Sequence, residues 1–126
     1  MLRRETEFRK LSYGDGINKA IRLLLGVLNA EHGIFLIDEI ENGLYYDLYA
    51  DALSALYQSA MKLQCQLLIT THNQQILQTS ADVMLKHNSL DQLAYQRMEQ
   101  YKDDKRAYAF SGEELSHAMK VDMEVR

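Results

Sequence analysis

The chain has 126 residues, of which 47% are hydrophobic and 25% charged, and its formal net charge is −4 at pH 7. This composition is typical of a soluble globular protein and excludes disordered, collagen-like and membrane-spanning classes, while the length predicts one domain over residues 1–126. The acidic balance gives no overall attraction for nucleic acid, and the single cysteine, Cys65, excludes a disulfide or a Cys-based zinc site within one chain, so we expect a cytoplasmic protein with no membrane partner.

The first predicted element is a helix over residues 17–28, where apolar side chains recur at spacings of three and four. Ser12 and Asp15 stand at capping-box spacing ahead of it, and Gly14 and Gly16 would let the backbone approach a ligand closely. A free helix N-terminus at this point offers unpaired N–H groups to an anion. An ordinary turn followed by a cap fits the same residues.

A short apolar run, residues 34–37, predicts a strand buried on both faces of a parallel sheet. The strand is followed directly by two acids, Asp38 and Glu39. In a nucleotide hydrolase, the first acid after such a strand holds Mg²⁺ and the second accepts a proton from the attacking water. A solvated strand end is the alternative.

After a turn at residues 41–43, we expect a helix over residues 45–63 and a second buried strand over residues 66–70. Thr71 and Gln74 have capping-box spacing, so we expect a short helix that starts just after the second strand and runs to about Gln78. This places His72 at a strand-to-helix corner. Strand, helix and strand in this order form a βαβ unit, and the carboxyl ends of its strands share one edge of the sheet, where ligands gather. A histidine there can donate a hydrogen bond to a phosphate oxygen or orient a water, although it can also be purely structural.

The last part of the chain predicts a β-hairpin from residues 93–100 and 106–110 around a polar turn. Ser111 and Glu114 have capping-box spacing at the start of a final helix that runs to Val121. The expected fold class is therefore α/β, with a parallel βαβ core followed by a hairpin and a C-terminal helix.

Together these motifs resemble the ABC-type ATPase heads of the SMC and recombination-repair kind, and especially the AAA-like, OLD-type ATPases. Residues 11–15, Leu-Ser-Tyr-Gly-Asp, look like the ABC signature motif, although Tyr13 stands where transporters have glycine. Residues 34–39 look like Walker B, residues 41–44 like the D-loop, and His72 like the switch histidine. The hairpin and final helix are also similar to the end of these ATPases, so that the chain is expected to be the C-terminal part of a P-loop NTPase fold.

The resemblance implies roles for individual residues. Asp38 would bind Mg²⁺, Glu39 would act as general base, and His72 would sense the γ-phosphate of ATP. The remaining implied contacts are to a nucleotide held mainly by a second ATPase head, and they fall on Ser12, Gly14, Asp15, Gly16 and Asn42.

The phosphate-binding loop of these ATPases is missing, because no G-x-x-x-x-G-K-[ST] occurs in the chain. We therefore expect the distal half of an ATPase that is inactive without a P-loop-bearing N-terminal half or a second head, and that meets nucleic acid only through a larger assembly. One alternative is a non-catalytic assembly or regulatory module that docks on a P-loop partner or forms a homodimer. Another is a metal-dependent phosphoesterase or nuclease built on Asp38, Glu39 and His72.

Overall fold

The structure is a computed structural model that describes the backbone of residues 2–121 and the side chains of residues 14–121. Its contacts group the chain into two compact units, Met1–Asn73 and Gln74–Arg126. The single domain expected for residues 1–126 stays a prediction. Within residues 2–121, every helix is too short or too polar to cross a lipid bilayer.

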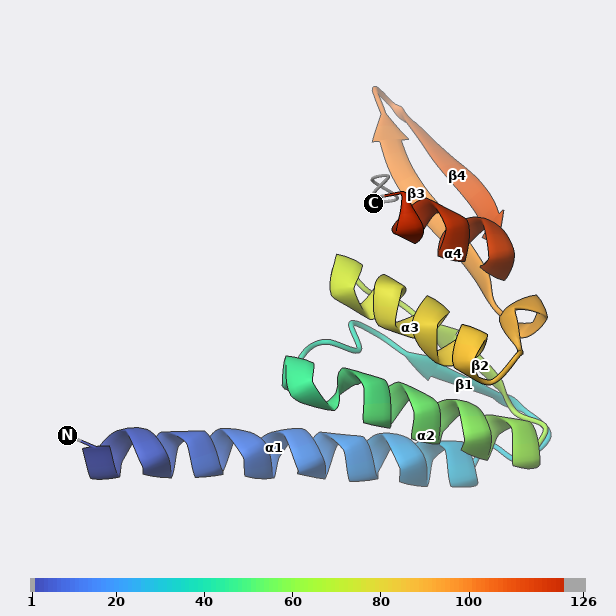
Figure 1. Ribbon diagram of the computed structural model, residues 1–126. Helices are drawn as coiled ribbons and strands as arrows, with labels where there is room; N and C mark the ends of the chain where they lie inside the picture. The colour runs from blue at the N-terminus through green and yellow to red at the C-terminus, as the bar shows by residue number, and fades with distance from the viewer. Residues whose placement is uncertain (1, 122–126) are drawn as a thin grey trace. The chain divides into compact units, whose positions relative to one another are not determined.

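The first unit contains the predicted βαβ core. Its elements are α1 (Leu2–Leu28), β1 (Ile34–Ile37), a 3₁₀ turn at Tyr46–Leu48, α2 (Tyr49–Lys62) and β2 (Gln66–Ile69). The strands pair in parallel, with Ile34 opposite Gln66 and Ile37 opposite Ile69, which confirms the prediction. Helices α1 and α2 run alongside each other (Figure 1).

The start of the first helix was predicted wrongly. Instead of beginning after Asp15, α1 starts at Leu2 and runs without a break through Gly14 and Gly16. Residues 2–11 are mostly good helix formers and contain no proline, so they extend the helix past Ser12, and the two glycines cost only about 1 kcal/mol each in a helix interior. In the structure, residues 14–16 therefore offer no free helix N-terminus.

The expectation that both strands are buried on two faces is also wrong. Ile34 and Leu36 of β1 and Leu68 of β2 lie on one face and are 62%, 66% and 57% exposed. On the other face Ile37 is only 5% exposed and the Phe35 ring packs against α1 at Gly26. The helices of the first unit thus cover one side of a two-stranded sheet and leave an apolar side open.

The core of the first unit lies between α1, α2 and the strands. Its most buried large side chains are Val27, Ile40 and Leu56, and the Cys65 thiol is also buried. Burial of each such aliphatic side chain stabilises the fold by roughly 1.5–3 kcal/mol. This core holds the two strand ends in place for the residues that follow them.

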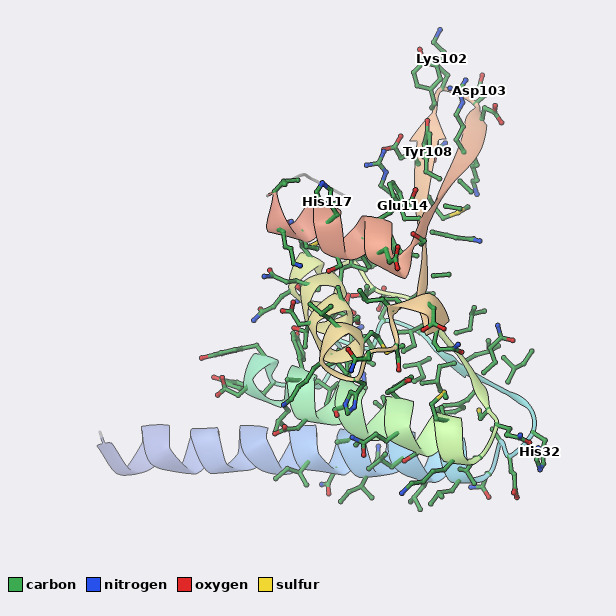
Figure 2. The ribbon with its side chains drawn as sticks, turned by 45° about the vertical axis from the view of Figure 1, so that its right-hand side comes forward. His32, Lys102, Asp103, Tyr108, Glu114 and His117 are labelled. Carbon is green, nitrogen blue, oxygen red and sulfur yellow. The ribbon has the colours of Figure 1, made fainter. Side chains whose placement is uncertain are left out.

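The second unit contains α3 (Gln74–Lys86), β3 (Ala94–Tyr101), β4 (Asp104–Ser111) and α4 (Gly112–Lys120). β3 and β4 pair antiparallel, which confirms the predicted hairpin, and Lys102 and Asp103 form its tip (Figure 2). Ala81 of α3 packs with Leu115 and Ala118 of α4.

The ends of the helices in the second unit follow from local chemistry. Ser111 and Glu114 form the predicted capping box, with reciprocal bonds of 3.2 and 2.7 Å. Helix α3 is longer than predicted, because residues 79–86 contain no helix breaker and its chain reverses only near Asn88, which has φ of 53°.

Two glycines of α1 provide a matched test of this packing. A Cβ at Gly26 would lie 2.2 Å from the Phe35 ring, whereas a Cβ at Gly14 would meet nothing within 4 Å. We expect Gly26→Ala to lower the free energy of unfolding by about 1–3 kcal/mol through overpacking. Gly14→Ala should raise it by about 0.5–1 kcal/mol through helix propensity. Urea denaturation followed by circular dichroism measures both, and equal effects of the two variants would contradict the described contact between α1 and β1.

Candidate active site

The candidate site lies where β1 and β2 end side by side. Backbone hydrogen bonds continue the pairing beyond the strands, from Thr70 N–H to the Ile37 carbonyl at 2.9 Å and from Ile40 N–H to the Thr70 carbonyl at 3.2 Å. The acids after β1 therefore lie beside the residues after β2. We call residues 38–44 the β1 turn and residues 70–73 the β2 turn.

Thr70 joins the two turns through its hydroxyl. It donates to Asp38 Oδ1 at 2.5 Å and accepts from the Glu39 backbone N–H at 2.8 Å. Thr70 therefore holds the Asp38 carboxylate by one of its two oxygens. Reasoning from the sequence missed Thr70, because a threonine at a strand end has no distinctive pattern of its own.

Glu39 and His72 meet across the two turns. His72 Nε2 lies 3.5 Å from Glu39 Oε1, and the side chains are 84% and 43% exposed, so water and ligands reach both. The other Glu39 oxygen accepts a 2.5 Å hydrogen bond from the Asn42 side-chain amide. Glu39 itself has φ of 46°, a left-handed conformation that is strained for a side chain other than glycine.

Glu41 makes a second pair of hydrogen bonds between the β1 turn and the β2 turn. Its Oε1 accepts from the His72 backbone N–H and its Oε2 accepts from the Thr71 hydroxyl, each at 2.7 Å. Burial raises the pKa of the Glu41 carboxyl, but the hydrogen bonds from the His72 and Glu41 backbone, from the Thr71 hydroxyl and the nearby His72 charge outweigh it. The net pKa of Glu41 lies below its ordinary value of 4.5.

Lys19 connects α1 to the β1 turn, and sequence reasoning missed this residue as well. Its ammonium donates to the Asn42 backbone carbonyl. Burial lowers the pKa of Lys19 by more than the charges of Glu41 and Glu39 raise it. The role of Lys19 could be recognised only once the packing of α1 against the β1 turn was known.

One comparison with known proteins identifies the family. Residues 2–78, more than half of the chain, match the family model described as "AAA domain, putative AbiEii toxin, Type IV TA system". The chain belongs to this AAA domain family. No curated protein matches the chain, and no solved structure does.

Membership of the AAA domain family supports an ATPase-like domain and, in general, the use of a nucleotide with Mg²⁺. The matched span contains α1, both parallel strands and the two turns that follow them. The mixed α/β architecture with a small parallel sheet is consistent with part of a P-loop NTPase. The family match alone assigns no role to individual residues.

The structure describes three of the four predicted nucleotide contacts on α1 fully and the fourth only by its backbone. Gly14, Asp15 and Gly16 lie in the helix, and the side chain of Ser12 is outside the described residues. A Cβ at Gly16 would lie 3.1 Å from Leu48 Cδ1, so this glycine allows α1 to approach the segment after the β1 turn. A nucleotide contact at these four positions stays a prediction.

Among the side chains of residues 14–121, no three or more His, Cys, Asp or Glu residues gather in a group that could hold a metal ion. The role of Asp38 as a Mg²⁺ ligand stays a prediction. One carboxylate suits Mg²⁺ in a nucleotide site, where one or two carboxylates are completed by phosphates and water.

The lowered pKa of Glu41 predicts a pH dependence of stability. Because the folded-state pKa is below the ordinary value of 4.5, the charged carboxylate stabilises the fold above that pH, and this contribution is lost as pH falls through the folded pKa. We expect Glu41→Gln to destabilise the chain most near pH 7, and the difference from wild type to shrink below about pH 4.5. Urea denaturation at a series of pH values, with the exposed Glu31→Gln as control, measures this, and a difference that is constant with pH would contradict it.

Proposed function

We propose that this chain provides the hydrolysis edge of an ABC-type ATPase head of the AAA-like, OLD-related kind. In this proposal Asp38, Glu39 and His72 act on the γ-phosphate of ATP. The phosphate-binding loop comes from an N-terminal half or from a partner polypeptide, because the 126 residues contain no such loop.

The observation that supports the proposal most strongly is the meeting of Glu39 and His72 at 3.5 Å, at the carboxyl ends of two adjacent parallel strands. Ligands of open α/β sheets bind at this edge. Asp38 stands beside the pair and is held there by the Thr70 hydroxyl. An acid pair and an imidazole in this place suit phosphoryl transfer, in which positioning and charge stabilisation provide most of the catalysis.

Each side chain has a distinct part in the reaction. Glu39 accepts a proton from the water that attacks the γ-phosphate, through a lone pair of a carboxylate oxygen that its present contacts leave available. His72 donates a hydrogen bond from its imidazole to a γ-phosphate oxygen, and its 84% exposure leaves it free to do so. Asn42, which donates to Glu39, orients the carboxylate.

The residues present fit Mg²⁺ bound together with a triphosphate. Asp38 would hold the ion by a carboxylate oxygen, and the bound ion would neutralise charge on the phosphates. A bound nucleotide would be contacted by Ser12, Gly14, Asp15 and Gly16 of a second head. These residues belong to a helix here. Ser12 and Asp15 could therefore contact the nucleotide through their side chains, whereas Gly14 and Gly16 could do so only if α1 opened locally.

The uncovered apolar side of the sheet supports a partner that has an apolar surface of its own. Ile34, Leu36 and Leu68 form one exposed face, and parallel sheets almost always have both faces covered. A P-loop-bearing lobe with an apolar helix or strand would cover this face and would bring the phosphate cradle to the same sheet. A second copy of this chain is the other candidate, which corresponds to a non-catalytic assembly module.

The proposal predicts that activity depends on a second polypeptide. The purified chain should show no ATP turnover above that of Glu39→Gln. Addition of a P-loop-bearing polypeptide, identified by co-purification with the tagged chain and by its G-x-x-x-x-G-K-[ST] motif, should give Mg²⁺-dependent phosphate release. In that complex Glu39→Gln should reduce kcat by about 10²–10⁴-fold, the usual contribution of a general base.

Glu31→Gln is the matched control, since Glu31 forms a similar exposed pair with His32 at 3.7 Å, at the opposite end of β1. It should leave turnover unchanged. Magnesium-dependent turnover by the chain alone that is lost in Glu39→Gln would overturn the requirement for a P-loop partner. Light scattering that shows self-association, with no ATP binding even when a P-loop polypeptide is present, would favour the assembly module instead.

A further inference from the structure

The Glu41 side chain extends from the β1 turn to the β2 turn, and the proposed reaction does not explain these contacts. One carboxylate accepts two hydrogen bonds of 2.7 Å, both from residues that lie 30 and 31 positions further along the chain. Hydrogen bonds to a charged acceptor are about twice as strong as those between neutral groups. Glu41 is therefore a strong side-chain link from the β1 turn to Thr71 and His72 of the β2 turn.

The partner that this link holds is the backbone of His72 rather than its imidazole. The imidazole is 84% exposed, and its described neighbour is the Glu39 carboxylate at 3.5 Å. Packing therefore contributes little to the position of the ring, and the place of the His72 backbone decides where the ring lies. Thr71 is fixed in the same way, because its hydroxyl donates to Glu41 and accepts from the Asn73 backbone N–H at 3.0 Å.

We propose that Glu41 is a positioning residue that sets the distance between His72 and Glu39 by clamping the backbone of the β2 turn to the β1 turn. This inference rests on the proposed ATPase function. Glu41 and Glu39 belong to the same tight turn, in which the Asn42 backbone N–H bonds to the Glu39 carbonyl at 2.9 Å. The clamp therefore joins the proposed general base to the proposed phosphate sensor. The three consecutive residues 39–41 connect them on one side, and the hydrogen-bonded Glu41 carboxylate connects them on the other.

The charged groups around Glu41 are favourable to this role. Lys19 approaches from α1 and His72 from the β2 turn, and both attract the carboxylate when they are protonated. A glutamine at this position keeps the size of the side chain but has one acceptor oxygen and no charge, so it cannot accept from both donors in the same way. Glu41→Gln therefore separates the clamp from simple space filling.

The first test follows the clamp itself in the full chain by NMR. In the wild type, the His72 amide proton should be protected from hydrogen exchange and its resonance should shift as acid protonates its acceptor carboxylate. In Glu41→Gln that shift should disappear, and in Glu41→Ala exchange of the His72 amide should become at least about tenfold faster, which corresponds to loss of one charge-assisted hydrogen bond. An amide that exchanges at the same rate in wild type and Glu41→Ala would overturn the proposal.

The second test asks whether the clamp positions the imidazole. In the wild type, Glu39→Gln should move the ring resonances of His72, because the two side chains are in contact. In a Glu41→Ala background the same substitution should move them by less than half as much. His32 and Glu31 provide the internal control, since their exposed pair should respond to Glu31→Gln equally in both backgrounds. An undiminished His72 response in Glu41→Ala would overturn the positioning role.

The third test joins the clamp to the reaction and separates the two proposals. In the complex with a P-loop polypeptide, Glu41→Gln should lower kcat by about tenfold or more and leave KM for ATP within about twofold, because a positioning defect acts on the reaction step. Unchanged kcat in an active complex would overturn the clamp alone. Absence of turnover in every such complex, with the wild-type NMR signatures intact, would overturn the proposed ATPase function while the contact itself stands.

Discussion

The parallel pairing of two four-residue strands is the constraint on which the rest of the candidate site depends. Because Ile37 pairs with Ile69 and the ladder continues through Thr70, the chain must place residues 38–41 beside residues 70–72. A slip of one residue would turn every side chain of the strand to the other face and would move the acids away from the imidazole. The register is held by the buried side of the sheet, where Ile37 packs in the core and the Phe35 ring fits against Gly26.

Beyond the strands, polar side chains add to the order that burial of Ile40 and Leu44 gives the β1 turn. Thr70 holds Asp38 and the Glu39 backbone, while Glu41 holds Thr71 and the His72 backbone. Asp38, Glu39 and His72, in contrast, keep part of their surface exposed. Thr70 and Glu41 thus hold the backbone of the two turns, while the other three side chains face the solvent. In the proposed ATPase, hydrogen-bonded neighbours of this kind would keep the candidate residues within the small positional tolerance that the chemistry allows.

The sequence was sufficient for the features that depend on local patterns. The apolar run before Asp38, the second strand, the hairpin and the Ser111 capping box each have a signature within a few residues, and all are present. The length of α1 was missed, because Ser12 and Asp15 have the spacing of a cap while the residues before them also favour helix. Thr70, Glu41 and Lys19 were missed as site residues for another reason. Their roles exist only through partners 23 to 32 residues away, and no single-sequence pattern encodes such pairs.

The two glycines expected to approach a nucleotide illustrate why motif and packing must be separated. Gly16 is buried, and a side chain there would press on Leu48, so loss of activity in a Gly16 variant would follow from a displaced turn as readily as from a lost nucleotide contact. Gly14 has open space around its Cβ position. A substitution at Gly14 leaves the packing of α1 against the rest of the first unit intact. Any effect of that substitution on nucleotide use would then come from a direct contact at this part of the helix. The same logic favours Glu41 over Gly43 for probing the β1 turn, because Gly43 has φ of 80° and any side chain there strains the backbone before the site is altered.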